Sequence, residues 1–271
     1  MKRHNLYTIA SLFIGMLASC QSKTEDVMTR VNEGPVLNIG ISPVSRTSTD
    51  VDYKTVFSDK DLIGMYGTYR ESGELLHDNL CYNYDGTSGR WSADRPITFP
   101  LDGQELNFYS YYPYTEAANG KLKFDFTVEQ DQSIVEAYDK SDLLLASNTT
   151  VTNDAECVTL QFKHKLSMVE FEIKLPEGEE VKTVEVKAKR TAEVDLISQT
   201  VILKETGEEA EFILCSAVGD GKYRACVPAQ SLSGKIIRII TKSNRVYWYK
   251  SGMPLQLIAE TVTPVAVDCT K

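Results

Sequence analysis

Cys20 is the residue of this chain best placed to do chemistry, because it closes a Leu-Ala-Ser-Cys sequence at the end of a short apolar run. Two basic residues, Lys2 and Arg3, precede that run, which extends from Tyr7 to Leu17. A basic start followed by a short apolar stretch is typical of a secretory signal, and this stretch is too short to span a bilayer as a permanent helix. The sequence therefore predicts that residues 1–19 direct export and that the protein works outside the cytoplasm.

The four residues that end at Cys20 resemble the lipobox of bacterial lipoproteins, in which a small residue stands before a cysteine. The resemblance implies that residues 1–19 are removed and that the thiol of Cys20 carries a diacylglycerol, which anchors the protein in the outer membrane. Several acyl chains on one residue bind a membrane stably, whereas a single chain binds it only marginally. The alternative is an ordinary signal peptide followed by an incidental cysteine. Residues 20–35 are polar and mixed in charge, which favours a tether.

Enzyme chemistry finds little support elsewhere in the sequence. Once the signal is removed, only His77 and His164 remain as histidines, too few for a His₂ or His₃ metal site without carboxylates. No HExxH, GxSxG or Walker sequence is present, and no GxGxxG follows a strand pattern. The net charge of −9, which becomes −11 when Lys2 and Arg3 are lost, argues against nucleic acid as a partner. We therefore expect no catalytic residue and no site for a metal or cofactor.

Five cysteines remain besides Cys20, an odd number in a compartment that permits disulfides. The dipeptide Asp220-Gly221 is typical of a two-residue hairpin turn between strands at 212–218 and 223–227. Counting outward from that turn places Cys215 opposite Cys226, at a separation that a disulfide can bridge. The sequence thus predicts either that disulfide or two buried thiols.

Short strand patterns separated by turn signals fill the chain after the tether. The first pattern alternates Leu37, Ile39 and Ile41 with polar or small residues, and a polar tract at 45–50, expected to be exposed, follows it. Further strand patterns, among them Leu62–Tyr69, Val181–Ala188 and Thr200–Leu203, recur at roughly ten-residue spacing, which indicates an all-β sandwich architecture. The length favours two sandwiches, residues 36–150 and 151–271, joined within the polar stretch 147–156.

Several segments together resemble the fimbrillin-like proteins of Bacteroidales, a family of pilins and pilus-associated lipoproteins of the type V class. Each short motif is weak by itself, whereas their order and spacing along the chain are fairly specific. The matching segments are Asp61-Leu62-Ile63-Gly64-Met65-Tyr66, Trp91 followed by Pro100, Leu106-Asn107-Phe108-Tyr109-Ser110-Tyr111-Tyr112-Pro113, Asp142-Leu143-Leu144-Leu145-Ala146, the stretch from Leu160 to Val169 and, more loosely, Val227-Pro228-Ala229-Gln230.

The resemblance implies two transthyretin-like Greek-key β-sandwich domains in tandem and assembly by strand exchange. In such pilins an arginine-specific protease removes an N-terminal segment, which opens a groove for a strand of another subunit. Arg30 precedes the strand at 37–41, so a cut there would leave the groove closed. Arg46 follows that strand in the polar tract, so a cut there would remove it. Arg46 is therefore the predicted processing site, and the strand at 37–41 is the predicted displaced strand.

A candidate donor strand lies near the C-terminus, where Val265, Val267 and Cys269 alternate with other residues in an apolar row like that of the strand at 37–41. Three inward side chains could contribute about 1.5–3 kcal/mol each, in addition to ladder hydrogen bonds. Two interpretations stay open. The segment is either a donor for another subunit's groove or simply the protein's own last strand, and Pro264 at a strand start or edge suits both.

The resulting functional prediction is a cell-surface lipoprotein that acts as a fimbrial subunit or as a pilus-associated anchor or tip protein in adhesion. Its expected partners are other pilus subunits, of the same or a paralogous kind, and the outer membrane through the lipid anchor. The alternative is a monomeric surface lipoprotein that binds a glycan or host ligand with exposed rings such as Tyr109 or Trp248. An enzyme of the same fold would need a cleft with clustered acids.

Overall fold

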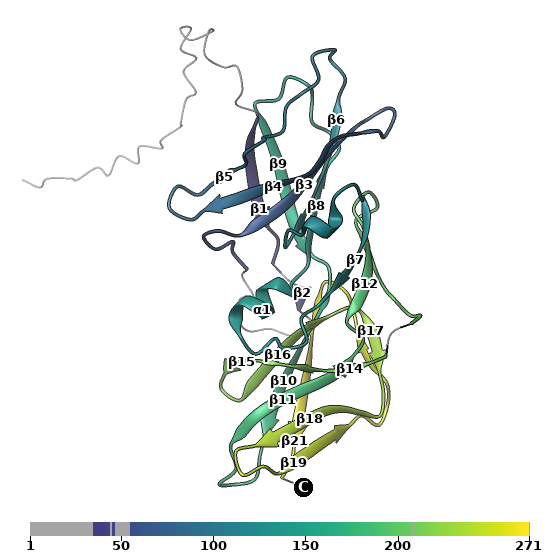
Figure 1. Ribbon diagram of the computed structural model, residues 1–271. Helices are drawn as coiled ribbons and strands as arrows, with labels where there is room; N and C mark the ends of the chain where they lie inside the picture. The colour runs from purple at the N-terminus through teal and green to yellow at the C-terminus, as the bar shows by residue number, and fades with distance from the viewer. Residues whose placement is uncertain (1–34, 44, 47–54, 208, 271) are drawn as a thin grey trace, which may run out of the picture. The chain divides into compact units, whose positions relative to one another are not determined.

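The computed structural model describes residues 35–43, 45, 46, 55–207 and 209–270. The predicted signal peptide, Cys20, the tether as far as residue 34 and the tract from Thr47 to Asp50 lie outside the described residues. The regular secondary structure of the described residues is almost all β-strand, as predicted, and its helical elements are a 3₁₀ turn η1 (Glu116–Ala118) and a short helix α1 (Val135–Lys140) (Figure 1). Neither of these helices is long and apolar enough to cross a membrane.

The largest sheet contains seven strands. In spatial order these are β1 (Val36–Ile41), β9 (Cys157–His164), β8 (Leu144–Asn148), β6 (Leu106–Tyr112), β3 (Leu62–Tyr69), β4 (Leu75–Asp85) and β5 (Arg90–Ser92). All neighbouring pairs are antiparallel except β1 and β9, which run parallel. The two outer strands, β1 and β5, are therefore the places where this sheet ends.

Both faces of β6, in the middle of the seven-stranded sheet, are buried, which explains its many aromatic residues. Phe108 and Tyr112 lie in a first core, together with Ile63, Phe162 and other side chains of the same sheet. Tyr109 and Tyr111 point to the opposite face and lie in a second core. Because successive side chains of a strand point to opposite faces, a strand buried on both sides carries large apolar residues at every position rather than at alternate ones.

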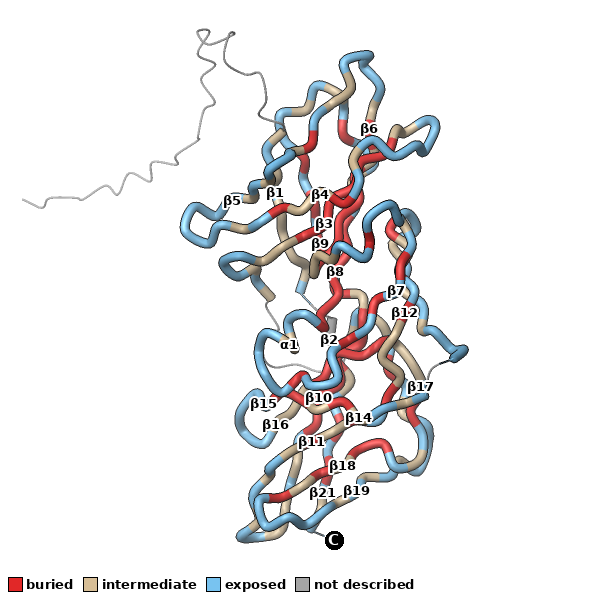
Figure 2. Tube along the Cα trace, in the orientation of Figure 1, coloured by how far each residue is buried: buried red, intermediate tan, exposed pale blue. Residues whose placement is uncertain are grey.

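The remaining sheets surround the second core (Figure 2). A five-stranded sheet has the order β15 (Ser216–Gly219), β16 (Lys222–Val227), β10 (Ser167–Lys174), β21 (Thr261–Asp268) and β2 (Ser45–Arg46), and a four-stranded sheet has the order β14 (Glu211–Leu214), β11 (Val181–Ala188), β18 (Lys235–Thr241) and β19 (Val246–Lys250). Smaller sheets are β13 (Thr200–Leu203), β12 (Thr191–Asp195) and β7 (Lys123–Thr127), and the pair β17 (Gln230–Leu232) and β20 (Leu255–Leu257). Phe171 of β10 and Val186 of β11 are fully buried members of this core, so the architecture is a β-sandwich.

The predicted boundary between residues 150 and 151 is wrong as a division between sheets. β9 follows that boundary in sequence but pairs with β8 and β1 in the seven-stranded sheet. β7 precedes the boundary in sequence but pairs with β12, which follows it in sequence. After β2 the chain returns to the five-stranded sheet only between β9 and β10, and the range Gly34–Lys271 forms one compact unit. A polar stretch shows where the chain turns at the surface, whereas sheet membership depends on pairings that the local pattern does not contain.

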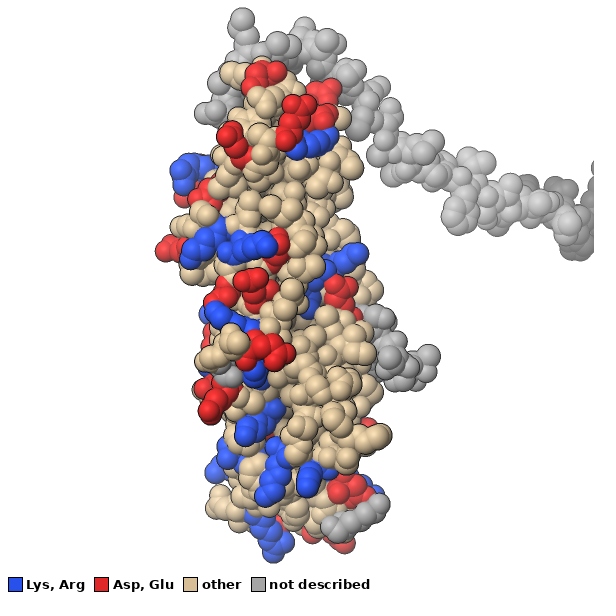
Figure 3. Space-filling view, turned by 90° about the vertical axis from the view of Figure 1, so that its right-hand side faces the viewer, with Lys and Arg blue, Asp and Glu red and all other residues tan. Residues whose placement is uncertain are grey.

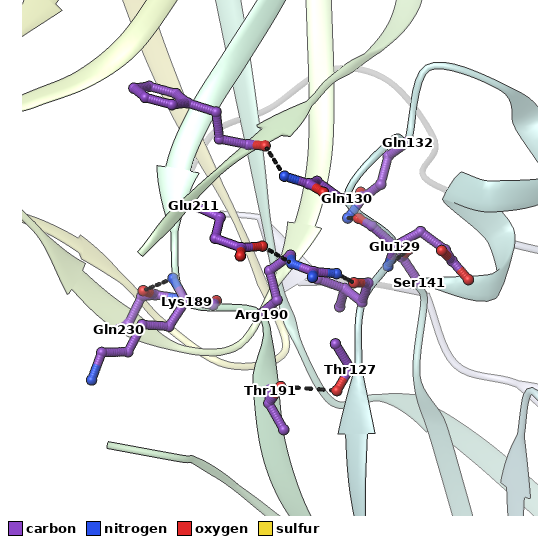
Figure 4. A network of polar contacts seen from close by, with 12 residues as sticks. Thr127, Glu129, Gln130, Gln132, Ser141, Lys189, Arg190, Thr191, Glu211 and Gln230 are labelled. Carbon is purple, nitrogen blue, oxygen red and sulfur yellow. Dashed lines mark hydrogen bonds and ion pairs between the residues drawn. The ribbon is translucent and has the colours of Figure 1, made fainter. Parts of the chain in front are cut away.

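Polar contacts fasten the segment after β7 to the sheets of the second core (Figure 4). Arg190 donates from Nε to a carboxylate oxygen of Glu211 at 2.7 Å and from Nη1 to the carbonyl of Val128 at 2.8 Å. Gln132 is fully buried, and its amide donates to the carbonyl of Cys226 at 2.9 Å and accepts from the Cys226 N–H at 2.8 Å. A buried amide that is satisfied on both sides is costly to displace, so this segment has one defined position.

Charged side chains of both signs lie side by side on the face shown in Figure 3. Ion pairs join neighbouring strands: Lys123 of β7 lies 2.8 Å from Asp195 of β12, and Arg238 of β18 pairs with Glu185 of β11. Ion pairs at the surface contribute at most about 1 kcal/mol each. The two apolar cores therefore account for most of the stabilisation.

Candidate assembly site at the terminal strands

The predicted displaced strand is β1, and it lies at the edge of the seven-stranded sheet. It pairs in parallel with β9 over six positions, from Val36 opposite Cys157 to Ile41 opposite Phe162. The N–H of Val36 donates to the carbonyl of Glu156 at 2.9 Å, so the ladder begins at the first residue of the strand. Among the described strands β9 is the sole partner of β1. Such a strand is held by one ladder only.

The apolar side chains of β1 pack against one side of the first core and stay partly exposed to solvent. Leu37, Ile39 and Ile41 are half-buried and pack against the first core, whereas Val36 is 68% exposed. A groove of about 330 Å³ runs beside this strand and reaches Trp91 of β5 on its other side. Full burial of an aliphatic side chain stabilises a fold by about 1.5–3 kcal/mol, and these half-buried side chains contribute correspondingly less.

Phe57 is the residue of the groove lining with the most ring contacts. Its ring lies edge-on to the rings of Trp91, Tyr112 and Phe162, with centroids 4.9, 5.6 and 5.6 Å away. Phe57 follows Arg46 in sequence, so it would stay with the protein after a cut at Arg46. Phe57 and Trp91 would therefore still line the groove after β1 has been removed.

Arg46 lies where the chain leaves one sheet and joins another. After β1 the chain passes Ser42 and Pro43, and Ser45 and Arg46 then form β2, which pairs in parallel with Thr261 and Val262 at the start of β21. The predicted exposed tract therefore begins with a two-residue strand, and its continuation from Thr47 lies outside the described residues. A cut after Arg46 would separate both β1 and β2 from the rest of the chain.

The candidate donor segment is β21, and in this structure it is the protein's own strand. It pairs in parallel with β10 over seven positions, from Met168 opposite Val262 to Lys174 opposite Asp268. Val265 and Val267 are 8% and 2% exposed and lie in the second core. Cys269 is half-buried just behind the strand, where burial and then the neighbouring Asp268 raise the pKa of its thiol. Donation to another subunit, which remains a prediction, would require this strand to leave its own core.

The predicted opposition of Cys215 and Cys226 is wrong. The N–H of Cys215 bonds to the carbonyl of Val184 in β11, so the chain changes sheets at this residue. The turn at Asp220-Gly221 is present as predicted, but a register shift between Ala217 and Gly219 places Ser216 opposite Arg224. One extra residue in a strand moves every later pair by one position. Both thiols are buried and free, and burial is the largest cause that raises the pKa of each.

The two rings suggested for ligand binding differ in exposure. Tyr109 is 5% exposed and belongs to the second core, so its expected exposure is wrong. Trp248 is 41% exposed on β19, where Lys235 lies 5.1 Å and Arg238 5.9 Å from its ring centroid. Its ring therefore already has cationic neighbours from β18.

Two features of the site escaped the sequence reasoning. Phe57 is a large apolar residue close behind the polar tract, which could have indicated an anchor beneath the displaced strand. Cys157 is exposed and lies opposite Val36. This pairing joins strands that are distant in sequence, so a local sequence pattern does not predict it.

Comparisons with known proteins agree with this architecture. In fold the chain is similar to two crystal structures of candidate cell adhesion proteins: one from Bacteroides ovatus, with a TM-score of 0.66 and 17% identity over 88% of this chain and 93% of that one, and one from Bacteroides uniformis, with a TM-score of 0.62 and 16% identity over 79% of this chain and 88% of that one. A fimbrial protein from Bacteroides ovatus is similar with a TM-score of 0.52 and 18% identity over 88% of this chain and 49% of that one. These similarities concern the fold alone.

Sequence comparison adds the family. The chain matches no curated protein in sequence. The sequence profile of the fimbrillin-like family, in contrast, matches residues 45–261, which is most of the chain. The chain therefore belongs to the fimbrillin-like family.

Proposed function

We propose that this protein is a surface lipoprotein of a pilus, anchored through an acylated Cys20, that acts as a fimbrial subunit or as an anchor or tip protein in adhesion. Its role in this proposal is structural and not enzymatic. Membership of the fimbrillin-like family and the fold shared with fimbrial and candidate cell adhesion proteins support it. The Leu-Ala-Ser-Cys sequence before residue 21 supports the anchor.

Assembly in this proposal begins with hydrolysis of the peptide bond after Arg46. The released piece contains β1 and β2, and its loss leaves one side of β9 without a partner. A strand of another subunit then takes the place of β1, forms the ladder with β9 and lays its apolar side chains over Phe57. Main-chain hydrogen bonds supply affinity in such strand addition, and pockets for alternate side chains supply specificity.

The position of β1 is the observation that carries this proposal. It is an edge strand with one partner, its apolar row is half-buried, and it precedes the predicted cut by only a few residues. A central strand could not leave without breaking two ladders. An edge strand of this kind can be replaced by another of similar sequence while the rest of the sheet stays intact.

A disulfide that locks β1 onto β9 tests the proposal directly. Val36 and Cys157 are opposed and both exposed, and neighbouring strands lie about 4.7–4.9 Å apart, within disulfide range. We expect oxidised Val36→Cys precursor, cut by an arginine-specific protease, to form no polymers in electron micrographs, because β1 stays tied to β9. Reduction should restore the polymers.

Val36→Ser is the matched control, since it changes the same exposed position without a thiol. Arg46→Ala should prevent both the cut, seen as an unchanged N-terminus by mass measurement, and the polymers. Polymerisation of oxidised Val36→Cys to the extent of Val36→Ser would rule out displacement of β1.

A second candidate role is a monomeric lipoprotein that binds a glycan or host ligand. It uses the same fold without processing at Arg46. A polar hollow on β4 favours it, and that hollow can work in an assembled subunit as well as in a single molecule.

A further inference from the structure

A hollow of about 950 Å³ lies over β4, the strand that pairs with β5 (Figure 1). We call it the β4 trough. Its polar lining includes Asp78, Asn83, Asp94, Arg95, Tyr114 and Asn119. The first core lies on the other face of β4, because Tyr82 points into that core while its neighbours Cys81 and Asn83 line the trough. A volume of this size is at the upper end of those of small-ligand sites.

One wall of the trough is the turn around η1, and β4 holds it in place. Both carboxylate oxygens of Asp78 accept from the N–H of Gly120, at 2.8 and 3.0 Å. The buried amide of Asn79 donates to the carbonyl of Thr115 at 2.9 Å and to Oδ1 of Asn119 at 2.6 Å. The hydroxyl of Tyr111 in turn donates to Oδ1 of Asn79 at 2.8 Å. This wall is therefore fixed by a satisfied buried network.

The opposite wall is the segment that follows β5, and it too is tied to β4. The N–H of Ile97 donates to the hydroxyl oxygen of Tyr82 at 2.7 Å. The ring nitrogen Nε2 of His77 lies 2.7 Å from the carbonyl oxygen of Thr98. Because both walls are bonded to the same strand, the trough is preorganised, and little ordering would be needed when a ligand binds.

A bulge in β4 shapes the lining of the trough near Asn79. Asn79 has a φ of 41°, and the pairing of β4 with β3 shifts between Met65 and Gly67. Gly64 makes this arrangement possible, since a Cβ there would lie 2.1 Å from the ring of Tyr111 and 2.5 Å from Oδ1 of Asn79. An extended peptide adds to an open sheet edge, whereas β4 lies between β3 and β5 and the trough lies over its face. The trough is thus a poor acceptor for an extended peptide.

The side chains that remain free in the trough suit a polyhydroxyl ligand. Asn83, Asp94 and Arg95 are exposed, and no hydrogen bond or ion pair engages their side chains within the described part of the chain. An amide, a carboxylate and a guanidinium together offer donors and acceptors to neighbouring hydroxyl groups. The half-buried ring of Tyr114 adds an apolar surface with a polar tip, against which a sugar ring can lie.

The charges select among such ligands. Two carboxylates, those of Asp78 and Asp94, and one guanidinium, that of Arg95, line the trough, and this excess of negative charge disfavours an anionic sugar. No group of three metal-binding side chains occurs among the residues described. The geometry points to a binding site for a neutral oligosaccharide in the β4 trough. This site goes beyond the proposed assembly role, because it requires neither processing nor strand exchange.

An array of immobilised neutral oligosaccharides of galactose, glucose and N-acetylhexosamines, with sialylated and sulfated forms beside them, tests this site. The probe is the unprocessed full chain in detergent. We expect binding to a subset of the neutral oligosaccharides, reduced at least tenfold by Asn83→Ala and by Asp94→Ala. Trp248→Ala, the matched control on another sheet, should leave binding unchanged. Absence of neutral binders, binding of charged forms only, or binding that survives both trough variants would overturn the proposal.

Alkylation of cysteines gives a second readout that does not depend on the variants. Cys81 lies half-buried in the trough, whereas Cys157 is exposed on β9. The bound oligosaccharide should slow alkylation of Cys81, mapped by mass spectrometry, and leave Cys157 unaffected. Equal rates with and without the oligosaccharide would place its binding elsewhere. Because these experiments use unprocessed protein, failure here leaves the assembly proposal untouched, and failure of the Val36→Cys test leaves this site untouched.

Discussion

The two terminal strands of this protein have similar sequences and different surroundings. β1 carries a row of three apolar residues, β21 carries two of a similar row with Cys269 just behind it, and each strand runs parallel to its main partner. The row of β1 is half-buried beside an open groove, whereas Val265 and Val267 of β21 are 8% and 2% exposed within the second core. Periodicity therefore shows which side of a strand faces inward, but the depth of burial depends on what lies above it.

Because of this difference in burial, we expect the two strands to have different roles in strand exchange. Removal of β1 uncovers one side of β9 and three half-buried side chains, which a similar strand can cover again. Removal of β21 would uncover β10 and empty part of the second core. β21 also has an outer edge that β2 covers only at Thr261 and Val262, and Pro264 just beyond cannot donate a ladder hydrogen bond there. We infer that β1 is the replaceable strand and β21 the permanent one.

The largest expected effect comes from a charge placed in each strand. Val267→Asp buries a carboxylate without a partner in the second core and should destabilise the fold by about 3–5 kcal/mol. Ile39→Asp, its match in β1, leaves the carboxylate beside the open groove and should cost about 1–2 kcal/mol. Denaturant unfolding followed by fluorescence measures both. Equal losses would mean that β1 is as firmly built into the fold as β21.

A disulfide lock on β21 sharpens the comparison at the level of assembly. Glu172 and Ala266 are opposed and exposed on β10 and β21, so the double variant Glu172→Cys/Ala266→Cys can join the two strands. We expect processed, oxidised protein to polymerise as well as the wild type, because β21 does not need to leave its sheet. The matched lock on β1, Val36→Cys with Cys157, should block polymers under the same conditions.

The opposite result would be equally informative. If the β21 lock stops polymerisation and reduction restores it, the segment with Val265, Val267 and Cys269 is a donor strand after all. The same row would then alternate between its own core and another subunit's groove.

Much of the strand pattern could be predicted from the sequence, and particular segments show why. Leu62–Tyr69, Val181–Ala188 and Thr200–Leu203 were predicted with the bounds that the structure has, because turn residues flank each strand. The Asp220-Gly221 turn was found for the same reason. Cys215 was misplaced because a bulge two residues later shifts the register, and a bulge leaves no periodic signature.

The candidate site was predicted in part. The strand at 37–41 and the arginine behind it follow from local pattern, and both lie at a sheet edge as strand exchange requires. Cys157 and the two walls of the β4 trough were missed, since each depends on pairing between distant segments. The trough, for example, needs Gly64, Asn79 and Tyr111 to meet. The spacing of these three residues along the chain does not indicate that they come together in the fold.

The smallest expected effect concerns the two cysteines nearest the terminal strands. A thiolate and not a thiol reacts with iodoacetamide, and the raised pKa of Cys269 keeps its thiol protonated to higher pH. At pH 8 we therefore expect Cys269 to react several-fold more slowly than the exposed Cys157, and its rate to keep rising above pH 9. Peptide mapping after timed alkylation measures both rates. Similar rates at pH 8 would show that the end of β21 opens as readily as the edge beside β1, and the distinction between a permanent and a replaceable strand would not hold at that end.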